Sequence, residues 1–177
     1  MTDALNDSQL LSKKECVVHV NAASLADLLI KNNFFMAAAE SCTGGMIAAA
    51  CTDLAGSSAW FERGFVTYSN SAKTEMLGVD AALIDRWGAV SEPVARAMAL
   101  GAIAHSKAQV SVAVTGVAGP SGGSADKPVG TVWFGWSVAG LVTSECLLFE
   151  GDRAAVRAAT VRHALGRLAD LLAVPAE

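Results

Sequence analysis

The 177-residue sequence has few charged side chains and no excess of basic ones. Aspartate, glutamate, lysine and arginine make up 17% of the chain, with 17 acidic against 13 basic residues and a net charge of -4. Binding the phosphate backbone of a nucleic acid depends on clustered lysine and arginine. A broad nucleic-acid-binding face is therefore disfavoured, and we expect no nucleic-acid partner.

Long apolar segments are also missing. The longest uncharged stretches, residues 108–125 and 128–144, are interrupted by glycine, proline or hydroxyl side chains, whereas a membrane-spanning helix needs about 20 mostly apolar residues. Residues 1–11 contain two aspartates and no hydrophobic core of a secretory signal. These absences predict a cytoplasmic protein without a membrane partner.

Familiar metal and cofactor motifs are absent. The three histidines are far apart in sequence, and no C-x-x-C, H-E-x-x-H, G-x-G-x-x-G or G-x-x-x-x-G-K-S/T pattern occurs. We therefore expect no bound metal and no organic cofactor, and an intracellular chain keeps its thiols reduced. A serine-histidine-aspartate triad assembled in space stays open. The four thiols are Cys16, Cys42, Cys51 and Cys146.

What is present is ample material for one core, because 53% of the residues are hydrophobic. Strand and helix patterns alternate along the chain and end in a hairpin at Ala139-Gly140, which predicts a three-layer α/β/α fold with a mixed β-sheet. Residues 1–20 are expected to form an N-terminal arm or short helix, and residues 21–177 a single domain. Predicted strands cover 34–39, 63–69, 110–114, 131–137 and 141–149; predicted helices cover 22–32 and 46–51, begin near 72, 80 and 92, and end with one over 153–172.

The first segment that suggests chemistry is Glu40-Ser41-Cys42-Thr43-Gly44-Gly45, between a buried strand and a helix. Unpaired amides at a helix start suit a phosphate or a developing oxyanion. A serine at that place is also exposed enough to attack. The alternative is that Ser41 or Thr43 only caps the helix.

A second such segment covers residues 116–130, which contain five glycines among fifteen residues and lie between two strands. Loops of this length are commonly functional or disordered. If the segment is ordered, its glycines let the backbone approach a ligand and offer several amides to an anion.

Tyr68 and Lys73 flank a predicted strand-to-helix junction, so both are candidates to face the same sheet edge as Ser41. A lysine near apolar walls loses its proton near neutral pH and then acts as a base for serine. The alternative is a solvated lysine.

Arg153 lies in the first turn of the last predicted helix, where the helix dipole disfavours a cation. Arg157 and Arg162 on the same helix are interpreted as a solvated stripe.

Taken together, these residues resemble the C-terminal domain of the competence/damage-inducible CinA family. The resemblance runs from about Leu25 to Leu171. It rests on residues 39–45, 56–61, 64–70 with Lys73, 88–94, 115–120, 127–133 and 151–153.

Stand-alone members of that family are nicotinamide-nucleotide amidases, and this chain is similar to them in length. The resemblance therefore implies hydrolysis of nicotinamide mononucleotide to nicotinate mononucleotide and ammonia, in pyridine-nucleotide salvage. We also expect the protein to be a homo-oligomer. Ser41 is then the nucleophile, and Lys73 and Tyr68 assist proton transfer. The expected substrate-binding residues are Thr43, Gly44, Gly45, Thr115, Gly116, Gly119 and Arg153.

Two other functions stay open. A non-catalytic nucleotide-binding module with a role in competence or DNA damage would keep the glycine loops without needing Ser41. A cysteine amidase would use Cys42, whose thiolate the same helix terminus would favour.

Overall fold

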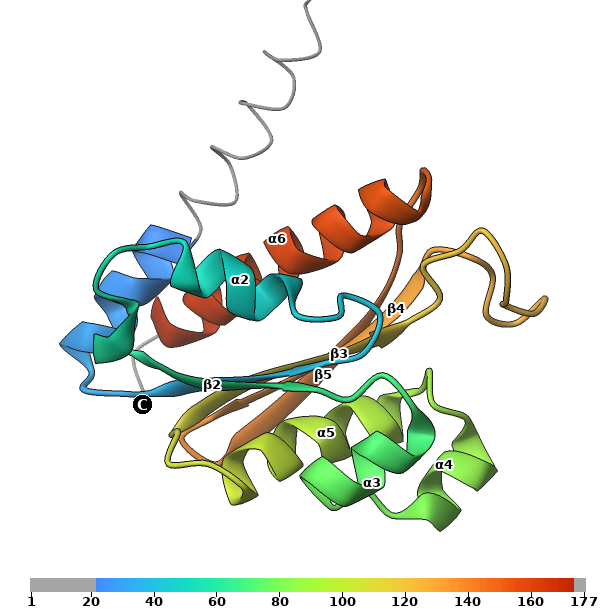
Figure 1. Ribbon diagram of the computed structural model, residues 1–177, viewed down its shortest axis with the longest axis horizontal. Helices are drawn as coiled ribbons and strands as arrows, with labels where there is room; N and C mark the ends of the chain where they lie inside the picture. The colour runs from blue at the N-terminus through green and yellow to red at the C-terminus, as the bar shows by residue number, and fades with distance from the viewer. Residues whose placement is uncertain (1–21, 174–177) are drawn as a thin grey trace, which may run out of the picture.

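The computed structural model describes residues 22–173, which form a five-stranded sheet between two layers of helices (Figure 1). The sheet is mixed, so the predicted three-layer α/β/α fold is confirmed. The arm or short helix predicted for residues 1–20 lies outside the described residues.

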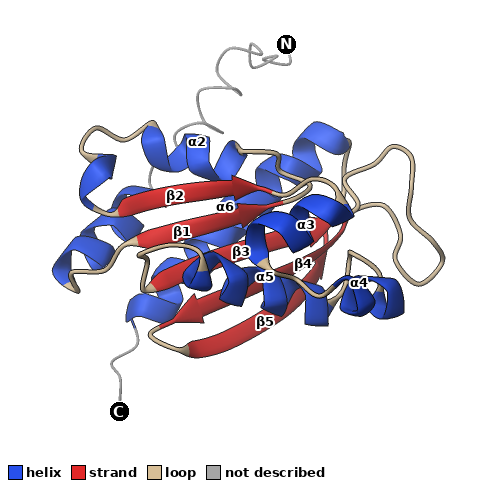
Figure 2. Cartoon of the chain, turned by 60° about the horizontal axis from the view of Figure 1, so that its bottom comes forward, coloured by secondary structure: helices blue, strands red, loops and turns tan. Residues whose placement is uncertain are grey.

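The strands lie in the order β2-β1-β3-β4-β5 (Figure 2). Strands β1, β2 and β3 are mutually parallel, and β4 and β5 continue the sheet in antiparallel pairing. No helix in the described part of the chain is long and apolar enough to cross a membrane. The strands are β1 Met36–Glu40, β2 Phe61–Val66, β3 Val110–Gly116, β4 Thr131–Val138 and β5 Leu141–Leu148; the helices are residues 22–31, α2 Met46–Thr52, α3 Asn70–Leu77, α4 Ala81–Trp87, α5 Glu92–Ala104 and α6 Arg153–Ala173, with a short 3-10 turn at Ser57–Ala59.

Each face of the sheet has its own apolar core. The helix over residues 22–31, α2 and α6 cover one face, and α3, α4 and α5 cover the other (Figure 1). Strand β1 feeds both cores alternately, with Met36 and Ala38 on the α6 side and Ala37 and Ala39 on the α5 side. Every residue of β1 is buried, as expected for a parallel strand covered on both faces.

Most local predictions are confirmed, with two shifts. The hairpin turns at Ala139-Gly140, where φ is 48° and 90°, and both positive values suit a tight two-residue turn. Asp80 caps α4 and Asp152 caps α6. The second strand ends at Val66 instead of continuing to 69, and the third helix is capped by Ser69, whose hydroxyl accepts a hydrogen bond from the amide of Ala72.

The glycine-rich loop over residues 116–130 is ordered and projects beyond the rest of the molecule (Figure 1). Its base is closed by backbone hydrogen bonds between residues 117 and 130–131, and its far part is pinned where the Lys127 ammonium donates to the Trp87 carbonyl at 2.9 Å. Of the two alternatives for this segment, the structure has the ordered loop.

The sheet topology places a crevice beside the end of β1. The chain leaves the carboxyl end of β1 along one face through α2 to reach β2, and leaves the carboxyl end of β2 along the other face through α3, α4 and α5 to reach β3. The connections from these two neighbouring strands thus diverge to opposite faces. In open α/β sheets, ligands bind at such a switch point.

The close approach of α5 to β4 generates a stability prediction. A Cβ added at Gly135 would lie 2.5 Å from the Ala95 carbonyl oxygen, so Gly135→Ala forces backbone apart and should lower the free energy of unfolding by about 1–3 kcal/mol. Ala139→Gly is the control, because residue 139 already has a positive φ that glycine adopts freely. Urea unfolding of both variants measures the difference. Equal midpoints would contradict the predicted clash.

Candidate active site

Ser41 is the first residue beyond β1 and lies at the switch point. Its amide donates to the Val114 carbonyl at 3.1 Å, which extends the pairing between β1 and β3 by one residue. The tight turn that follows places Gly44 and Gly45 at positive φ before α2 begins at Met46. The serine is therefore fixed through its backbone, with 9% of its surface exposed.

Glu40 holds the beginning of α2 from inside the protein. Its side chain is fully buried, and its carboxylate accepts hydrogen bonds from the amides of Gly45, Ile47 and Ala48 at 2.9 to 3.0 Å. These are amides at the helix start that were predicted from the sequence to bind a phosphate or an oxyanion. That expectation is wrong for this helix start, because the protein's own carboxylate already binds those donors.

Lys73 reaches Ser41 from the other side of the site. Its ammonium group donates to the Ser41 hydroxyl at 3.1 Å and to the Thr67 carbonyl at 2.9 Å, and only 1% of the residue is exposed. Burial lowers the pKa of Lys73 below its ordinary value, and the neighbouring Cys42 opposes this shift more weakly. No carboxylate of residues 22–173 forms a salt bridge with it. The solvated alternative for this lysine does not hold.

A pocket of about 260 Å³ opens above these two side chains. The structure brings six of the predicted site residues into its wall, and Thr43, Gly44, Gly45 and Gly119 do not line it. Cys42, the alternative nucleophile, also lines it. Sequence reasoning missed the remaining lining residues, because small apolar residues and an asparagine in a helix turn carry no chemical signal of their own. The wall consists of Ser41, Cys42, Tyr68, Asn70, Lys73, Ala89, Val90, Thr115, Gly116, Ala118 and Arg153.

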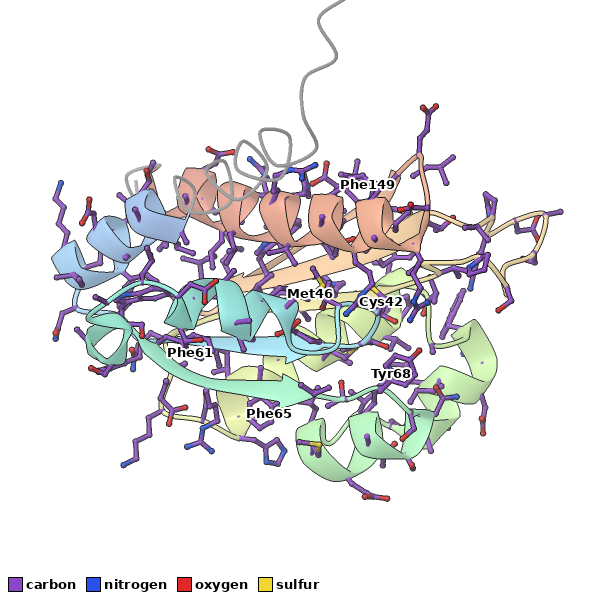
Figure 3. The ribbon with its side chains drawn as sticks, turned by 45° about the horizontal axis from the view of Figure 1, so that its top comes forward. Cys42, Met46, Phe61, Phe65, Tyr68 and Phe149 are labelled. Carbon is purple, nitrogen blue, oxygen red and sulfur yellow. The ribbon has the colours of Figure 1, made fainter. Side chains whose placement is uncertain are left out.

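Tyr68 and Arg153 stand at the mouth of this pocket. Tyr68 is 63% exposed, and its hydroxyl accepts a hydrogen bond of 3.4 Å from Arg153. The same guanidinium donates to the Gly119 carbonyl at 2.9 Å. Figure 3 shows Tyr68 and Cys42 at the same end of the sheet. Arg153 thus connects the mouth of the pocket to the loop over residues 116–130. Gly119 contributes a carbonyl that accepts a hydrogen bond from Arg153, and not an amide for a ligand.

Thr115 and Thr43 are both buried, with different surroundings. Thr115 donates its hydroxyl hydrogen to the Ala89 carbonyl at 2.8 Å and so holds the segment before α5 against the pocket. The hydroxyl of Thr43 has no hydrogen-bond partner within residues 22–173. Thr43 contributes its backbone instead, as its carbonyl accepts hydrogen bonds from Arg157 and from the Met46 amide.

Cys42 lines the pocket beside Ser41 but is poorly suited to attack. Burial raises the pKa of its thiol to about 11, with the charge of Glu40 adding to the shift. The thiol is therefore protonated near neutral pH, whereas the thiolate is the nucleophilic form. Residues 22–173 contain no group of three histidine, cysteine, aspartate or glutamate side chains placed to hold a metal ion.

The buried carboxylate generates a second stability prediction. Glu40→Gln replaces one acceptor oxygen by an NH₂ group that faces backbone amides, so we expect a loss of about 2 kcal/mol in the free energy of unfolding. Glu75→Gln, at an exposed position on α3, is the matched control. Chemical denaturation of the two variants measures the effect, and equal stability would argue against the carboxylate clamp.

Comparison with known proteins identifies the family. Residues 19–172 match the model of the CinA C-terminal domain. Among curated relatives, nicotinamide-nucleotide amidohydrolase PncC of Enterobacter agglomerans is 53% identical over 141 residues, which is 79% of this chain and 86% of that protein. PncC of Escherichia coli K12 is 55% identical over 133 residues, covering 73% of this chain and 79% of its own.

Solved structures agree with these sequence matches. A competence damage-inducible protein A from Klebsiella pneumoniae superposes with a TM-score of 0.86 at 40% identity, covering 88% of this chain and 97% of that one. A competence/damage inducible protein from Agrobacterium tumefaciens gives a TM-score of 0.85 at 44% identity, covering 88% and 95%. The predicted resemblance is confirmed: this chain belongs to the CinA C-terminal domain family.

Proposed function

We propose that this chain is a nicotinamide-nucleotide amidohydrolase that converts nicotinamide mononucleotide and water to nicotinate mononucleotide and ammonia, in pyridine-nucleotide salvage. The observation that carries the proposal is the 3.1 Å contact between the Ser41 hydroxyl and the buried Lys73 amine inside a pocket. Relatives named for this activity are 53% and 55% identical to the chain.

The first step is attack by Ser41. Neutral Lys73 keeps a hydrogen bond to the Thr67 carbonyl and takes the hydroxyl proton with its lone pair while the Ser41 oxygen bonds to the carboxamide carbon. The electron pair of the C=O double bond moves to oxygen. Because burial lowers the lysine pKa, the amine is available as a base nearer to neutral pH than a solvated lysine.

The oxyanion formed in this step needs hydrogen-bond donors. In the turn, the Ser41 amide donates to Val114, the Gly44 amide to Ser41 and the Gly45 amide to Glu40. The amides of Cys42 and Thr43 donate to no backbone carbonyl within the described residues. They directly follow the nucleophile, the place from which α/β-hydrolases supply one of their oxyanion donors, and by this analogy we assign them that role.

The intermediate then collapses and releases ammonia. Protonated Lys73 returns its proton to the departing nitrogen as the C–N bond breaks, which leaves an ester on Ser41. A water molecule attacks that ester, Lys73 accepts its proton, and the Ser41 oxygen leaves and is reprotonated. Tyr68, beside Arg153 at the mouth, assists proton transfer to the leaving group.

The rest of the pocket suits a pyridine nucleotide. Ala89, Val90 and Ala118 give the lining an apolar part against which an aromatic ring packs. Arg153 at the mouth is the cation placed to pair with the substrate phosphate. Binding by Gly44, Gly45 and Gly119 is not proposed, because none of them lines the pocket and their backbone groups already bond within the protein. Thr43 is proposed to contribute its backbone amide alone.

The other two functions are less well supported. A binding module has no need of a lysine buried against a serine hydroxyl, since burying an amine without a carboxylate partner costs stability. A cysteine amidase requires a thiolate, and the pKa of about 11 at Cys42 opposes it. A homo-oligomeric state, a cytoplasmic location and the absence of a nucleic-acid partner stay predictions.

Substitution at Ser41 and Cys42 tests the nucleophile. Ser41→Ala should abolish ammonia release from nicotinamide mononucleotide and leave the melting temperature nearly unchanged, whereas Cys42→Ala should retain most of the activity. The measurement is ammonia release by purified protein, with each variant's melting curve as the control. An active serine variant with an inactive cysteine variant would reverse the assignment, and a wild-type protein without activity would favour the binding module.

The role of Lys73 is tested by its pH dependence. Since burial lowers its pKa, the neutral fraction grows with pH, and kcat/KM should rise between pH 6 and 9. Lys73→Arg stays protonated and should lose on the order of a hundredfold or more in kcat, as should Lys73→Met. Steady-state kinetics of both variants across this pH range are the measurement. Near-normal kcat in the arginine variant would show that position 73 supplies only charge.

A further inference from the structure

Arg157 is bonded to the nucleophile turn although it does not line the pocket. It lies in the second turn of α6, and its guanidinium donates from Nε to the Cys42 carbonyl at 3.1 Å and from a terminal nitrogen to the Thr43 carbonyl at 2.8 Å. Arg153, four residues earlier on the same helix, does line the pocket. The two arginines therefore have separate tasks.

These contacts fix particular peptide planes. A trans peptide is rigid, and its N–H points opposite to the C=O of the same plane. The carbonyl of Cys42 shares its plane with the Thr43 amide, so the guanidinium that holds the carbonyl also sets the direction of that N–H. The preceding peptide plane contains the Ser41 carbonyl and the Cys42 amide. It is held by the Gly44 amide, which donates to the Ser41 carbonyl at 3.2 Å.

The remaining planes of the turn are held from the other side. Glu40 accepts the amides of Gly45, Ile47 and Ala48, and these bonds fix the entry to α2. Apart from Arg157, no donor of residues 22–173 bonds to the Cys42 carbonyl. The orientation of the Thr43 amide therefore depends on this single side chain.

We propose that Arg157 is a positioning residue for amide hydrolysis, which directs the backbone amides beside Ser41 toward the oxyanion by holding the carbonyls of Cys42 and Thr43. This inference rests on the proposed function. Its positive charge also polarises the held peptides, which strengthens their N–H groups as donors. Arg153 lines the pocket proposed to hold the substrate, whereas Arg157 does not.

The expected kinetic effect follows from where the amides act. An oxyanion exists in the transition state and not in the bound substrate, so misdirected donors lower kcat and leave KM nearly unchanged. Loss of an oxyanion donor costs about a hundredfold to a thousandfold, and a donor that is displaced and not removed costs less. We expect Arg157→Ala to lower kcat about tenfold to a hundredfold.

The experiment compares Arg157→Ala and Arg157→Lys with Arg167→Ala, which removes an exposed arginine from the same helix. Lysine lacks the fork that holds two carbonyls, so the lysine variant should also lose kcat with KM unchanged. Added guanidinium ion at millimolar concentration should restore part of the activity of Arg157→Ala and have no such effect on Arg167→Ala. Melting curves of all variants show whether they fold.

Two kinetic results would overturn the proposal. A folded Arg157→Lys or Arg157→Ala variant with wild-type kcat would show that the amides need no such support, and a raised KM with unchanged kcat would make Arg157 a substrate contact. If Arg157→Ala fails to fold, the kcat of the lysine variant decides between these outcomes.

A second readout separates this inference from the proposed function. A fluorophosphonate labels a reactive serine and places its phosphoryl oxygen where the oxyanion would lie, so the rate of labelling at Ser41 reports the same amides without nicotinamide mononucleotide. Slower labelling of Arg157→Ala than of wild type supports positioning even if the wild-type protein releases no ammonia from that substrate. Equal labelling rates would contradict it.

Discussion

A buried carboxylate without a cationic partner among the described side chains is the constraint around which the site is arranged. Glu40 ends the central parallel strand, and its charge is distributed over three backbone amides at the start of α2. This arrangement ties β1, the turn and α2 into one unit, because any shift of the helix would leave a charge unsatisfied inside the protein. Because Ser41 directly follows Glu40, this unit determines its position.

The same carboxylate shapes the electrostatics of the neighbouring groups. It adds to the burial that raises the pKa of the thiols at Cys42 and Cys51, so these side chains behave as small apolar groups. Lys73 approaches the serine from α3 without a carboxylate beside it among the described residues. The carboxylate of Glu40 and the amine of Lys73 therefore have different partners. Glu40 binds backbone amides of α2, whereas the Lys73 amine contacts the Ser41 hydroxyl.

The sequence predicted the architecture and much of the pocket because both follow local rules. Polar residues at the ends of predicted strands mark the sheet edge, so Ser41, Tyr68 and Lys73 could be expected to meet there, as the pocket wall has them. Thr115, Gly116 and Arg153 were expected in the site only through the family resemblance. The sequence could not show that the Gly45 amide is unavailable to a ligand, since only the three-dimensional path of the chain brings the Glu40 carboxylate within hydrogen-bond distance of it. Arg157 looked like part of a solvated stripe because its partner carbonyls lie 115 and 114 residues away in sequence, and helical spacing carries no information about such a distant contact.

The position of α6 has a consequence for the timing of maturation. Serine, lysine and the surrounding strands are all synthesised before residue 150, and both arginines that complete the mouth and the turn arrive with the helix after it. A nascent chain therefore carries the reactive pair well before it carries the side chains that orient it. The contacts of Arg153 and Arg157 can form only after α6 has been synthesised and has packed on the sheet.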